Sequence, residues 1–200
     1  MSKLQLTTER LVIRDFVEND WRSIVERTTQ ESVARYMQWD TTTWAEQEKV
    51  TAWIQEQQTL TFDTVGKYLE FAIDKDGVSI GTVGLKRLST ANRDAEIGWD
   101  LDPAYWVLGY ATEAAAALMD WCFRTLELRR FTSVCDARNT GSYKLMERLG
   151  MRREAHHLKS SFIKGEWEDD LVYAVLKDEW LSRLPPHYAV YNPESQEEPL

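Results

Sequence analysis

The sequence predicts an α/β domain in which a mixed, mostly antiparallel sheet is flanked by helices. Three observations lead to this prediction. Short apolar runs that alternate or carry glycines are separated by turn residues, as strands in hairpins are. One such run leads into an alanine-rich stretch with helical character. The 200 residues are 43% apolar, which is enough for one hydrophobic core, and no internal repeat or interdomain linker is apparent. We therefore expect one domain over residues 1–182 and an acidic surface tail over residues 183–200.

The first half of the chain is expected to form strands interrupted by helices. Strands are predicted over residues 6–16, 68–73, 78–85 and 96–101. Asp20 can cap a helix that starts at Trp21, and Thr43 and Glu46 have the spacing of a capping box before a second helix. The turn residues Asp74-Lys75-Asp76-Gly77 join the second and third strands in a hairpin.

The second half of the chain is predicted to alternate helix and strand before closing on a hairpin. We expect, in order, a helix over residues 109–126, a strand over 131–135, a helix over 143–149 and a hairpin over 162–176. Asn139 to Ser142 introduces the second of these helices, which Gly150 can end in a left-handed conformation. Lys164-Gly165 is the turn of the hairpin.

The composition argues against several classes of function. A formal charge of -9 disfavours nucleic acid, whose phosphates require a basic protein surface, and accommodates a cationic partner more easily. The same charge can also serve solubility alone. No apolar run approaches the roughly 20 residues of a membrane span and no signal peptide is apparent, so we expect a cytoplasmic protein without a membrane partner. Cys122 and Cys135 lie in apolar segments and are expected to be buried thiols, and no metal is implied.

The segment from Glu96 to Glu113 carries the strongest local signal, because a strand, a short loop and a helix start follow one another. A helix N-terminus presents unpaired amides and the positive end of a dipole, and Gly109 lets an anion approach the main chain closely. Such a turn can hold a pyrophosphate. Most strand-to-helix turns with a glycine bind nothing, so this segment alone does not decide the function.

Four ordered segments resemble the RimJ/RimL branch of the GNAT superfamily of N-acetyltransferases. Trp106-x-x-Gly109-Tyr110-Ala111-Thr112-Glu113-Ala114 is similar to that family's acetyl-CoA pyrophosphate loop. The other segments are Leu6-Thr7-Thr8-Glu9-Arg10-Leu11-Val12-Ile13-Arg14, Ala95-Glu96-Ile97-Gly98-Trp99, and Asn139-x-x-Ser142 with Glu147-Arg148-Leu149-Gly150-Met151 and the later Gly165-Glu166-Trp167-x-Asp169. The resemblance covers about residues 6–180. It implies a GNAT-type sheet whose central strands splay apart where acetyl-CoA enters.

The resemblance also implies acetyl-CoA as cosubstrate and assigns its binding residues by position. Trp99, Asp100 and Leu101 would line the pantetheine arm, with strand amides left unpaired for it. The pyrophosphate would be wrapped by Val107, Leu108, Gly109, Tyr110, Ala111 and Thr112, and Asn139 would lie beside the cofactor. The family often has glycine and a basic residue where Val107 and Leu108 stand, so a cationic contact with phosphate is lost in this chain.

The same resemblance supplies candidates for the general acid. Many GNAT enzymes place a tyrosine seven residues after the asparagine to protonate the departing thiolate, and Met146 stands there in this chain. Some RimJ/RimL members use the serine three residues on instead. Ser142 is therefore the first candidate and Tyr143 the second, with Asn139 at the mouth of the cleft.

The general base stays open between three carboxylates. Glu96 lies on the strand that resembles the active-site strand, Asp100 shares its side in a period of two, and Glu70 lies on a neighbouring predicted strand. Ribosomal-protein members can carry a carboxylate just before the closing hairpin, where this chain has Ser160-Ser161.

These residues together predict an acetyl-CoA-dependent N-acetyltransferase that acts on a primary amine by direct transfer in a ternary complex. The acceptor is expected to be a cationic small molecule, such as a polyamine or an aminoglycoside, or a protein N-terminus. The alternative is a regulatory or structural domain that binds CoA without turnover. A homodimer is compatible with the sequence.

Overall fold

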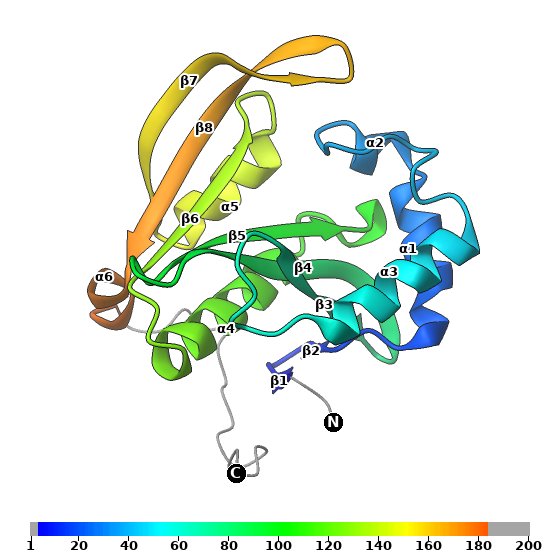
Figure 1. The fold of residues 1–200 in the computed structure, drawn as a ribbon, viewed down its shortest axis with the longest axis horizontal. Coiled ribbons are helices and arrows are strands. Elements are labelled where there is room, and N and C mark those ends of the chain that lie inside the picture. Colours follow the sequence, from blue (N-terminus) through cyan, green and yellow to red (C-terminus); the bar gives the residue numbers. More distant parts are fainter. Residues whose placement is uncertain (1–3, 184–200) are drawn as a thin grey trace.

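A computed structural model of the chain describes residues 4–183. Its centre is one eight-stranded sheet in the order β1-β2-β3-β4-β5-β6-β8-β7 (Figure 1). Neighbouring strands are antiparallel except β5 and β6, which are parallel. The predicted α/β class with a mixed, mostly antiparallel sheet is therefore confirmed. The tail predicted over residues 183–200 lies, from residue 184 on, outside the described residues.

The strands are β1 (Gln5–Thr7), β2 (Val12–Arg14), β3 (Tyr68–Lys75), β4 (Val78–Ser89), β5 (Asp94–Leu101), β6 (Arg130–Asp136), β7 (Arg152–Ile163) and β8 (Glu166–Leu176). The helices are α1 (Trp21–Thr28), α2 (Glu31–Ala34), α3 (Gln47–Thr59), α4 (Tyr110–Thr125), α5 (Thr140–Arg148) and α6 (Lys177–Leu181), with short 3-10 turns at Glu18–Asp20 and Pro103–Tyr105. Among the described helices, none combines the length and apolar character that crossing a membrane requires.

The opening segment is a hairpin, and the single strand predicted over residues 6–16 is wrong. β1 and β2 pair antiparallel, and the chain reverses between Thr8 and Leu11. The Thr8 amide donates to the Leu11 carbonyl at 2.9 Å, and the Thr8 hydroxyl accepts from the Leu11 amide at 3.0 Å. Leu6 and Ile13 lie opposite each other and enter the same core. An alternating pattern on both sides of the turn therefore looks like one continuous strand.

The first two predicted helix caps are not used as expected. α1 follows Asp20, but the Asp20 carboxylate accepts from the Val17 amide at 2.8 Å and makes no cap on α1. α3 begins at Gln47 and its N-cap Glu46 makes no side-chain hydrogen bond, so the capping box predicted from Thr43 is wrong. Both helices are stabilised instead by an apolar cluster against the sheet, formed by Phe16, Ile24, Val50, Ile54 and Ala72.

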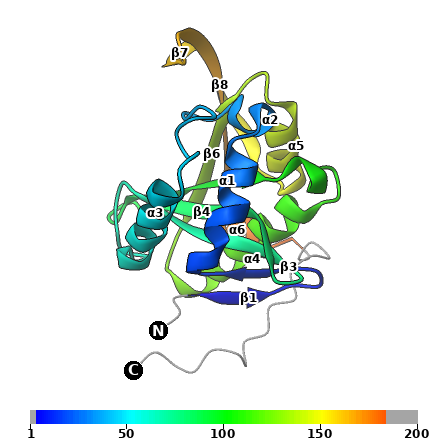
Figure 2. The same cartoon turned by 90° about the vertical axis from the view of Figure 1, so that its right-hand side faces the viewer.

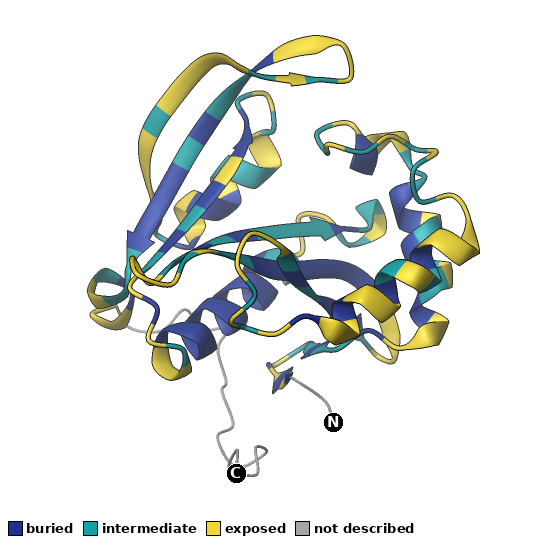
Figure 3. Ribbon diagram, in the orientation of Figure 1, coloured by how far each residue is buried: buried dark blue, intermediate teal, exposed yellow. Residues whose placement is uncertain are grey.

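Different helices cover the two faces of the sheet, and Figure 2 shows α3 and α5 on opposite sides of it. The face that packs against α1 and α3 through Ala72 of β3 is called the α1 face. The face that packs against α4 and α5 holds the larger apolar core and is called the α4 face. α4 is buried along most of its length (Figure 3), and the small side chains of Ala114–Ala117 allow it to approach the sheet closely.

Register places specific residues on the α1 face. Glu70 of β3 lies opposite Gly84 of β4, and Gly84 lies opposite Gly98 of β5. Side chains alternate along a strand, and Glu70 is two residues from Ala72, so this row shares the α1 face. Both predicted hairpins are present. β7 starts earlier than predicted. The prediction missed its first residues because β7 is exposed along most of its length (Figure 3) and shows no clear apolar pattern.

Candidate active site

β5 and β6 separate partway along their length (Figure 1). Their ladder pairs Asp94–Glu96 with Arg130–Thr132 and then stops, while both strands run on. The Ser133 hydroxyl still donates to the Ile97 carbonyl at 2.9 Å. Beyond this contact, the edge of β5 that faces β6 has no ladder partner within the described residues. Unpaired strand amides can hydrogen-bond an extended ligand or stabilise an oxyanion.

The loop between β5 and α4 ends in a helix start with open amides. Val107 and Gly109 have φ values of 58° and 85°, in the left-handed region that glycine adopts readily and valine does not. Within residues 4–183, the amides of Tyr110, Ala111 and Thr112 donate no hydrogen bond, as expected for the first turn of a helix. Open amides at the positive end of a helix dipole are groups that can bind an anion.

A buried ionic brace connects this loop to the opening hairpin. Glu113, in the first turn of α4, is 0% exposed. Its Oε1 accepts from the Thr8 hydroxyl at 2.6 Å and from the Arg10 amide at 3.0 Å, and its Oε2 lies 2.6 Å from Arg10 Nη2. Arg10 Nη1 also donates to the Leu108 carbonyl at 3.0 Å. The brace therefore links the path of the loop to a segment about one hundred residues earlier.

Cations near the loop come from other elements. Val107 and Leu108 are exposed and uncharged, as the sequence shows. At the end of α5, Arg148 Nε donates to the Thr112 hydroxyl at 3.4 Å, which places a guanidinium at the first turn of α4. An exposed arginine at that position can contact a phosphate bound by the helix start.

The start of α5 positions the predicted acid candidates on the α4 face. Asn139 caps the helix, because its Oδ1 accepts from the Ser142 amide at 3.1 Å. Burial raises the pKa of Cys135 to about 11, and a hydrogen bond with the Ser142 side chain opposes that rise. Ser142 therefore lies beside the end of β6, next to the gap. Tyr143 packs partly buried against the core, and Met146 is fully buried.

The residues predicted to line a pantetheine arm lie on both faces of β5. Trp99 and Leu101 point to the α4 face, where Leu101 is buried and Trp99 partly buried. Asp100 points to the α1 face, because it lies opposite Thr82 in the row of Ala72. Its predicted place in a cofactor site is therefore limited to its main chain.

Two of the three base candidates are already engaged on the α1 face. Glu96 Oε1 accepts a short hydrogen bond from the Tyr68 hydroxyl and one from Lys86 Nζ at 3.2 Å. Burial and the Glu96 charge raise the pKa of Tyr68, which keeps its hydroxyl protonated and donating. Asp100 forms a close ion pair with Arg27 Nε.

Arg27 is a buried cation beneath this face. It is 1% exposed, and its Nη2 donates to the Thr82 hydroxyl at 2.8 Å. Its Nη1 has no hydrogen-bond partner among the described residues. A buried guanidinium is expensive unless a carboxylate compensates it, so Asp100 is its structural counterion.

Glu70 differs from the other two carboxylates. The Glu70 amide donates to Gln57 Oε1 at 2.9 Å, but no hydrogen bond or ion pair reaches its carboxylate in the described part of the chain. The residue keeps part of its surface accessible. Burial, and next the negative charge of Asp100, raise its pKa to about 8, while Arg27 opposes the rise.

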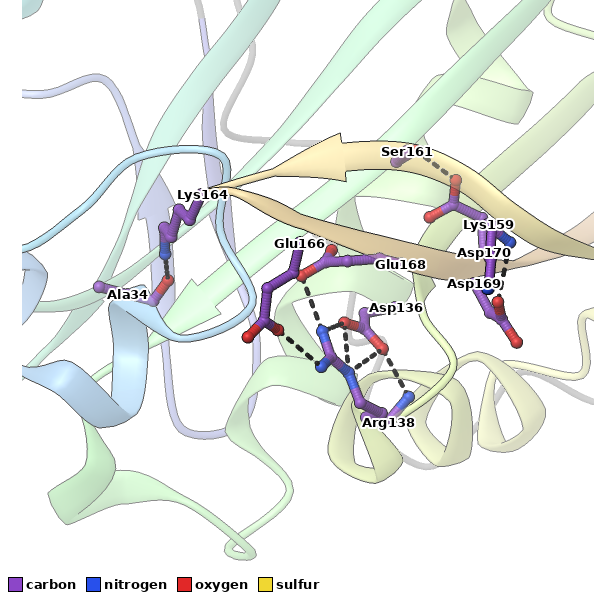
Figure 4. A network of polar contacts seen from close by, with 10 residues as sticks. All are labelled: Ala34, Asp136, Arg138, Lys159, Ser161, Lys164, Glu166, Glu168, Asp169 and Asp170. Atoms are coloured by element: carbon purple, nitrogen blue, oxygen red, sulfur yellow. Dashed lines mark hydrogen bonds and ion pairs between the residues drawn. The ribbon is translucent and has the colours of Figure 1, made fainter.

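The α1 face of β6 and β8 carries further carboxylates (Figure 4). Asp136 and Glu168 are both buried, and Arg138 Nη2 contacts both of them. Asp170 lies opposite Asp136 and accepts hydrogen bonds from the hydroxyls of Ser160, at 2.7 Å, and Ser161. Ser160 and Ser161 stand where ribosomal-protein members can carry a carboxylate. In this chain the two serines instead hold the Asp170 carboxylate of the neighbouring strand.

The tip of the β7–β8 hairpin reaches the helices that cover the α1 face. Lys164 Nζ donates to the Ala34 carbonyl at the end of α2 (Figure 4). This contact joins segments 130 residues apart. It ties the β7–β8 hairpin to α2 on the α1 side of the sheet.

Sequence reasoning missed the brace and the carboxylates of β6 and β8. Asp136 directly follows the predicted strand 131–135, which was an available signal. Arg10 and Glu113 belonged to two of the matched segments, but nothing in either segment indicated that they meet. Asp170 lay inside a predicted strand where one face had to be exposed.

Comparisons with known proteins agree with this geometry. Residues 10–152 match the model of the acetyltransferase (GNAT) domain. The uncharacterized N-acetyltransferase YnaD of Bacillus subtilis is 32% identical over 88% of this chain and 99% of its own length. The solved structure of a GNAT-family acetyltransferase from Bacillus anthracis superposes with a TM-score of 0.76 at 29% identity, covering 88% of this chain and 100% of that one.

Two relatives with named acceptors match a shorter part of the chain. The ribosomal-protein-serine acetyltransferase of Escherichia coli K12 is 31% identical over 54% of this chain and 60% of its own length. The spermidine N(1)-acetyltransferase of the same strain is 27% identical over 56% of this chain and 60% of its own length. The predicted similarity to ribosomal-protein acetyltransferases is confirmed.

Proposed function

The chain belongs to the GNAT acetyltransferase family and is an N-acetyltransferase of the acyl-CoA-dependent class, and from this premise we propose that it acetylates a cationic primary amine by direct transfer. One observation carries the proposal. The gap between β5 and β6 joins an anion site on the α4 face to a carboxylate-lined surface on the α1 face.

The donor side fits the pyrophosphate and pantetheine of acetyl-CoA. The open amides of Tyr110, Ala111 and Thr112 would hold the phosphates, with Arg148 as a cation beside them. The unpaired edge of β5 would hydrogen-bond the pantetheine amides along the gap. When bound there, acetyl-CoA supplies an activated acetyl thioester.

The acceptor side favours a positive charge. Asp170 accepts hydrogen bonds from two serine hydroxyls, and within residues 4–183 its carboxylate forms no ion pair. On the other side of the gap between β5 and β6, the α1 face carries Glu70, and also Asp100, which is paired with Arg27. A cleft lined by one sign of charge concentrates a substrate of the opposite sign. Spermidine, the named acceptor of one relative, has this character.

The proposed chemistry assigns one task to each group. Main-chain amides of β5 stabilise the negative charge that develops on the carbonyl oxygen. The Ser142 hydroxyl gives a proton to the departing sulfur, Asn139 holds the helix start that carries Ser142, and Tyr143 is the second acid candidate. A carboxylate of the α1 face, with Glu96 the first named from the sequence, accepts a proton from the amine.

Two other functions compete with this proposal. The shorter match to a ribosomal-protein acetyltransferase makes a protein N-terminus the second acceptor class. The second is a domain that binds CoA without turnover, because a cation such as Arg148 at the loop supports CoA binding in either case.

A two-stage experiment separates the three functions. Purified protein is first titrated with acetyl-CoA by calorimetry and then assayed for thiol release with spermidine, an aminoglycoside and a peptide with a free N-terminus. Thiol release that is fastest with a polycation supports the proposal. Release with the peptide alone would move the acceptor to protein N-termini, and binding without release from any amine would leave a CoA-binding domain.

A further inference from the structure

We propose that Glu70 is the general base of this acetyl transfer, an inference that rests on the proposed function and deepens it. The reason is geometric. Of the three base candidates on the α1 face of β3 and β5, Glu96 is held by Tyr68 and Lys86, and Asp100 neutralises Arg27. Glu70 alone among these three has no donor or cation on its carboxylate.

A glycine beside Glu70 leaves room for its side chain to turn toward the gap. Gly84 and Gly98 lie opposite each other on β4 and β5, in the row of Glu70. A Cβ atom on Gly84 would lie 2.6 Å from Glu70 Cγ, so the glutamate side chain lies across Gly84 in the direction of β5. Side chains larger than hydrogen at this position would exclude the carboxylate from this space. Gly84 therefore lets the Glu70 side chain lie toward β5, where the Tyr68 ring lies over Gly98 at the next position of the row.

The surroundings of Glu70 explain why it is held without a counterion. The charged groups that face it are Arg27 from α1, Asp100 and Glu96 from β5, and Lys86 from β4, while α3 contributes the uncharged Gln57. Arg27 and Lys86 are both directed to other carboxylates. An incoming ammonium group would be the first cation to contact Glu70 directly.

The direction of the Glu70 pKa agrees with this role. A general base works best when its pKa lies near the operating pH. Burial raises the pKa of Glu70 to about 8. The carboxylate form is therefore available above about pH 8, where an amine with an ordinary pKa near 10 still needs assistance. Approach of the cationic substrate opposes this rise, lowers the Glu70 pKa and favours the ionised form.

In the proposed step the acceptor nitrogen loses two protons, one to Glu70 and one to the departing sulfur. Glu70 takes one proton from the ammonium form of the acceptor and later releases it to solvent. The nitrogen lone pair freed in this way forms the C–N bond while the C–S bond breaks. The second proton lost by nitrogen ends on sulfur through Ser142, which donates its own hydroxyl proton and regains one. The products are an N-acetylated amine and a free thiol.

The test compares Glu70→Gln with Glu96→Gln, a matched change in the neighbouring row of the same face. Turnover with spermidine and with an amine of lower pKa is measured between pH 6 and 10. For the wild type we expect kcat to rise through about pH 8 with both amines, because the rise belongs to the enzyme. In Glu70→Gln this rise should disappear and kcat should fall about 10²-fold or more, while acetyl-CoA binding measured by calorimetry stays within about twofold.

A stability measurement separates this role from a structural one. The folded pKa of Glu70 is raised above its ordinary value of 4.5, so the stability it contributes is present below pH 4.5 and is lost as the pH rises through about 8. Glutamine cannot ionise and avoids that loss. Glu70→Gln should therefore fold and should melt at a higher temperature than the wild type at pH 8, by a margin that grows between pH 5 and 8.

The outcomes are distinct. A stable Glu70→Gln variant that binds acetyl-CoA and lacks turnover supports the proposal. Unchanged turnover in Glu70→Gln, or loss of the pH 8 rise in Glu96→Gln alone, would assign the proton to another group and overturn it. A wild-type protein without thiol release from any amine would overturn the proposed function itself, and with it this inference.

Discussion

The two faces of the sheet prepare the proposed reaction by different means. On the α4 face, the groups that would hold the donor are main-chain amides, and one buried brace from Thr8 and Arg10 to Glu113 links their loop to the opening hairpin. On the α1 face, the groups that would meet the acceptor are side chains, and two of them, the Glu70 and Asp170 carboxylates, form no ion pair within residues 4–183. The donor side is built into the fold, whereas the acceptor side depends on individual residues.

This difference teaches which changes each side tolerates. Amides are independent of side-chain identity, so Val107 and Leu108 can replace the usual residues of the loop without removing its amides. A carboxylate cannot be replaced in this way. Acceptor preference can therefore change through a few substitutions on the α1 face while the donor site remains, which agrees with the different acceptors named for relatives of this chain.

The largest expected effect concerns Ser142, which lies beside the end of β6, next to the gap between β5 and β6. Ser142→Ala should lower kcat by about 10² to 10⁴, because help from a general acid acts in the transition state, and it should leave the KM for acetyl-CoA nearly unchanged. Steady-state thiol release measures both. If Ser142→Ala keeps full turnover and Tyr143→Phe loses it, the acid is the tyrosine.

The second effect breaks the donor side at its brace. Glu113→Ala should lower the free energy of unfolding by about 3 to 5 kcal/mol, because it leaves Thr8 and Arg10 without their buried partner. Urea unfolding measures this loss. Glu48→Ala is the matched control, since Glu48 is also a glutamate in the first turn of a helix but is exposed. Equal losses in the two variants would show that the brace contributes nothing beyond a helix-terminal charge.

The smallest effect sharpens the acceptor side. Asp170→Asn should raise the KM of a polyamine by a few fold and that of a singly charged amine less. Added salt should reduce this difference, because it shortens the Debye length to about 8 Å. Asp169→Asn is the control, because Asp169 pairs with His156 on the opposite face of the hairpin. Parallel, salt-independent KM values in both variants would make the acidic composition a matter of solubility.

Much of the donor site could be predicted from the sequence, because its parts are local. The loop, Gly109 and the start of α4 are contiguous, and helix starts leave amides open in any sequence that forms them. Ser142 and Asn139 are likewise three residues apart and share one helix start. The single opening strand and the Asp20 cap were predicted incorrectly, since the turn at Thr8 and the engagement of Asp20 depend on hydrogen bonds that apolar periodicity does not reveal.

The sequence by itself determined the fold class, the family and the position of the glycine turn before α4, because each rests on short-range patterns of apolar, glycine and turn residues. Only the tertiary structure decided which carboxylates are engaged. Glu96, Asp100 and Glu70 are equivalent in sequence, and what separates them is that Tyr68, Arg27 and Gly84 approach from other elements. The charge and pKa of an acid depend on its neighbours in space, and those neighbours are assembled only when the sheet closes against α1 and α3.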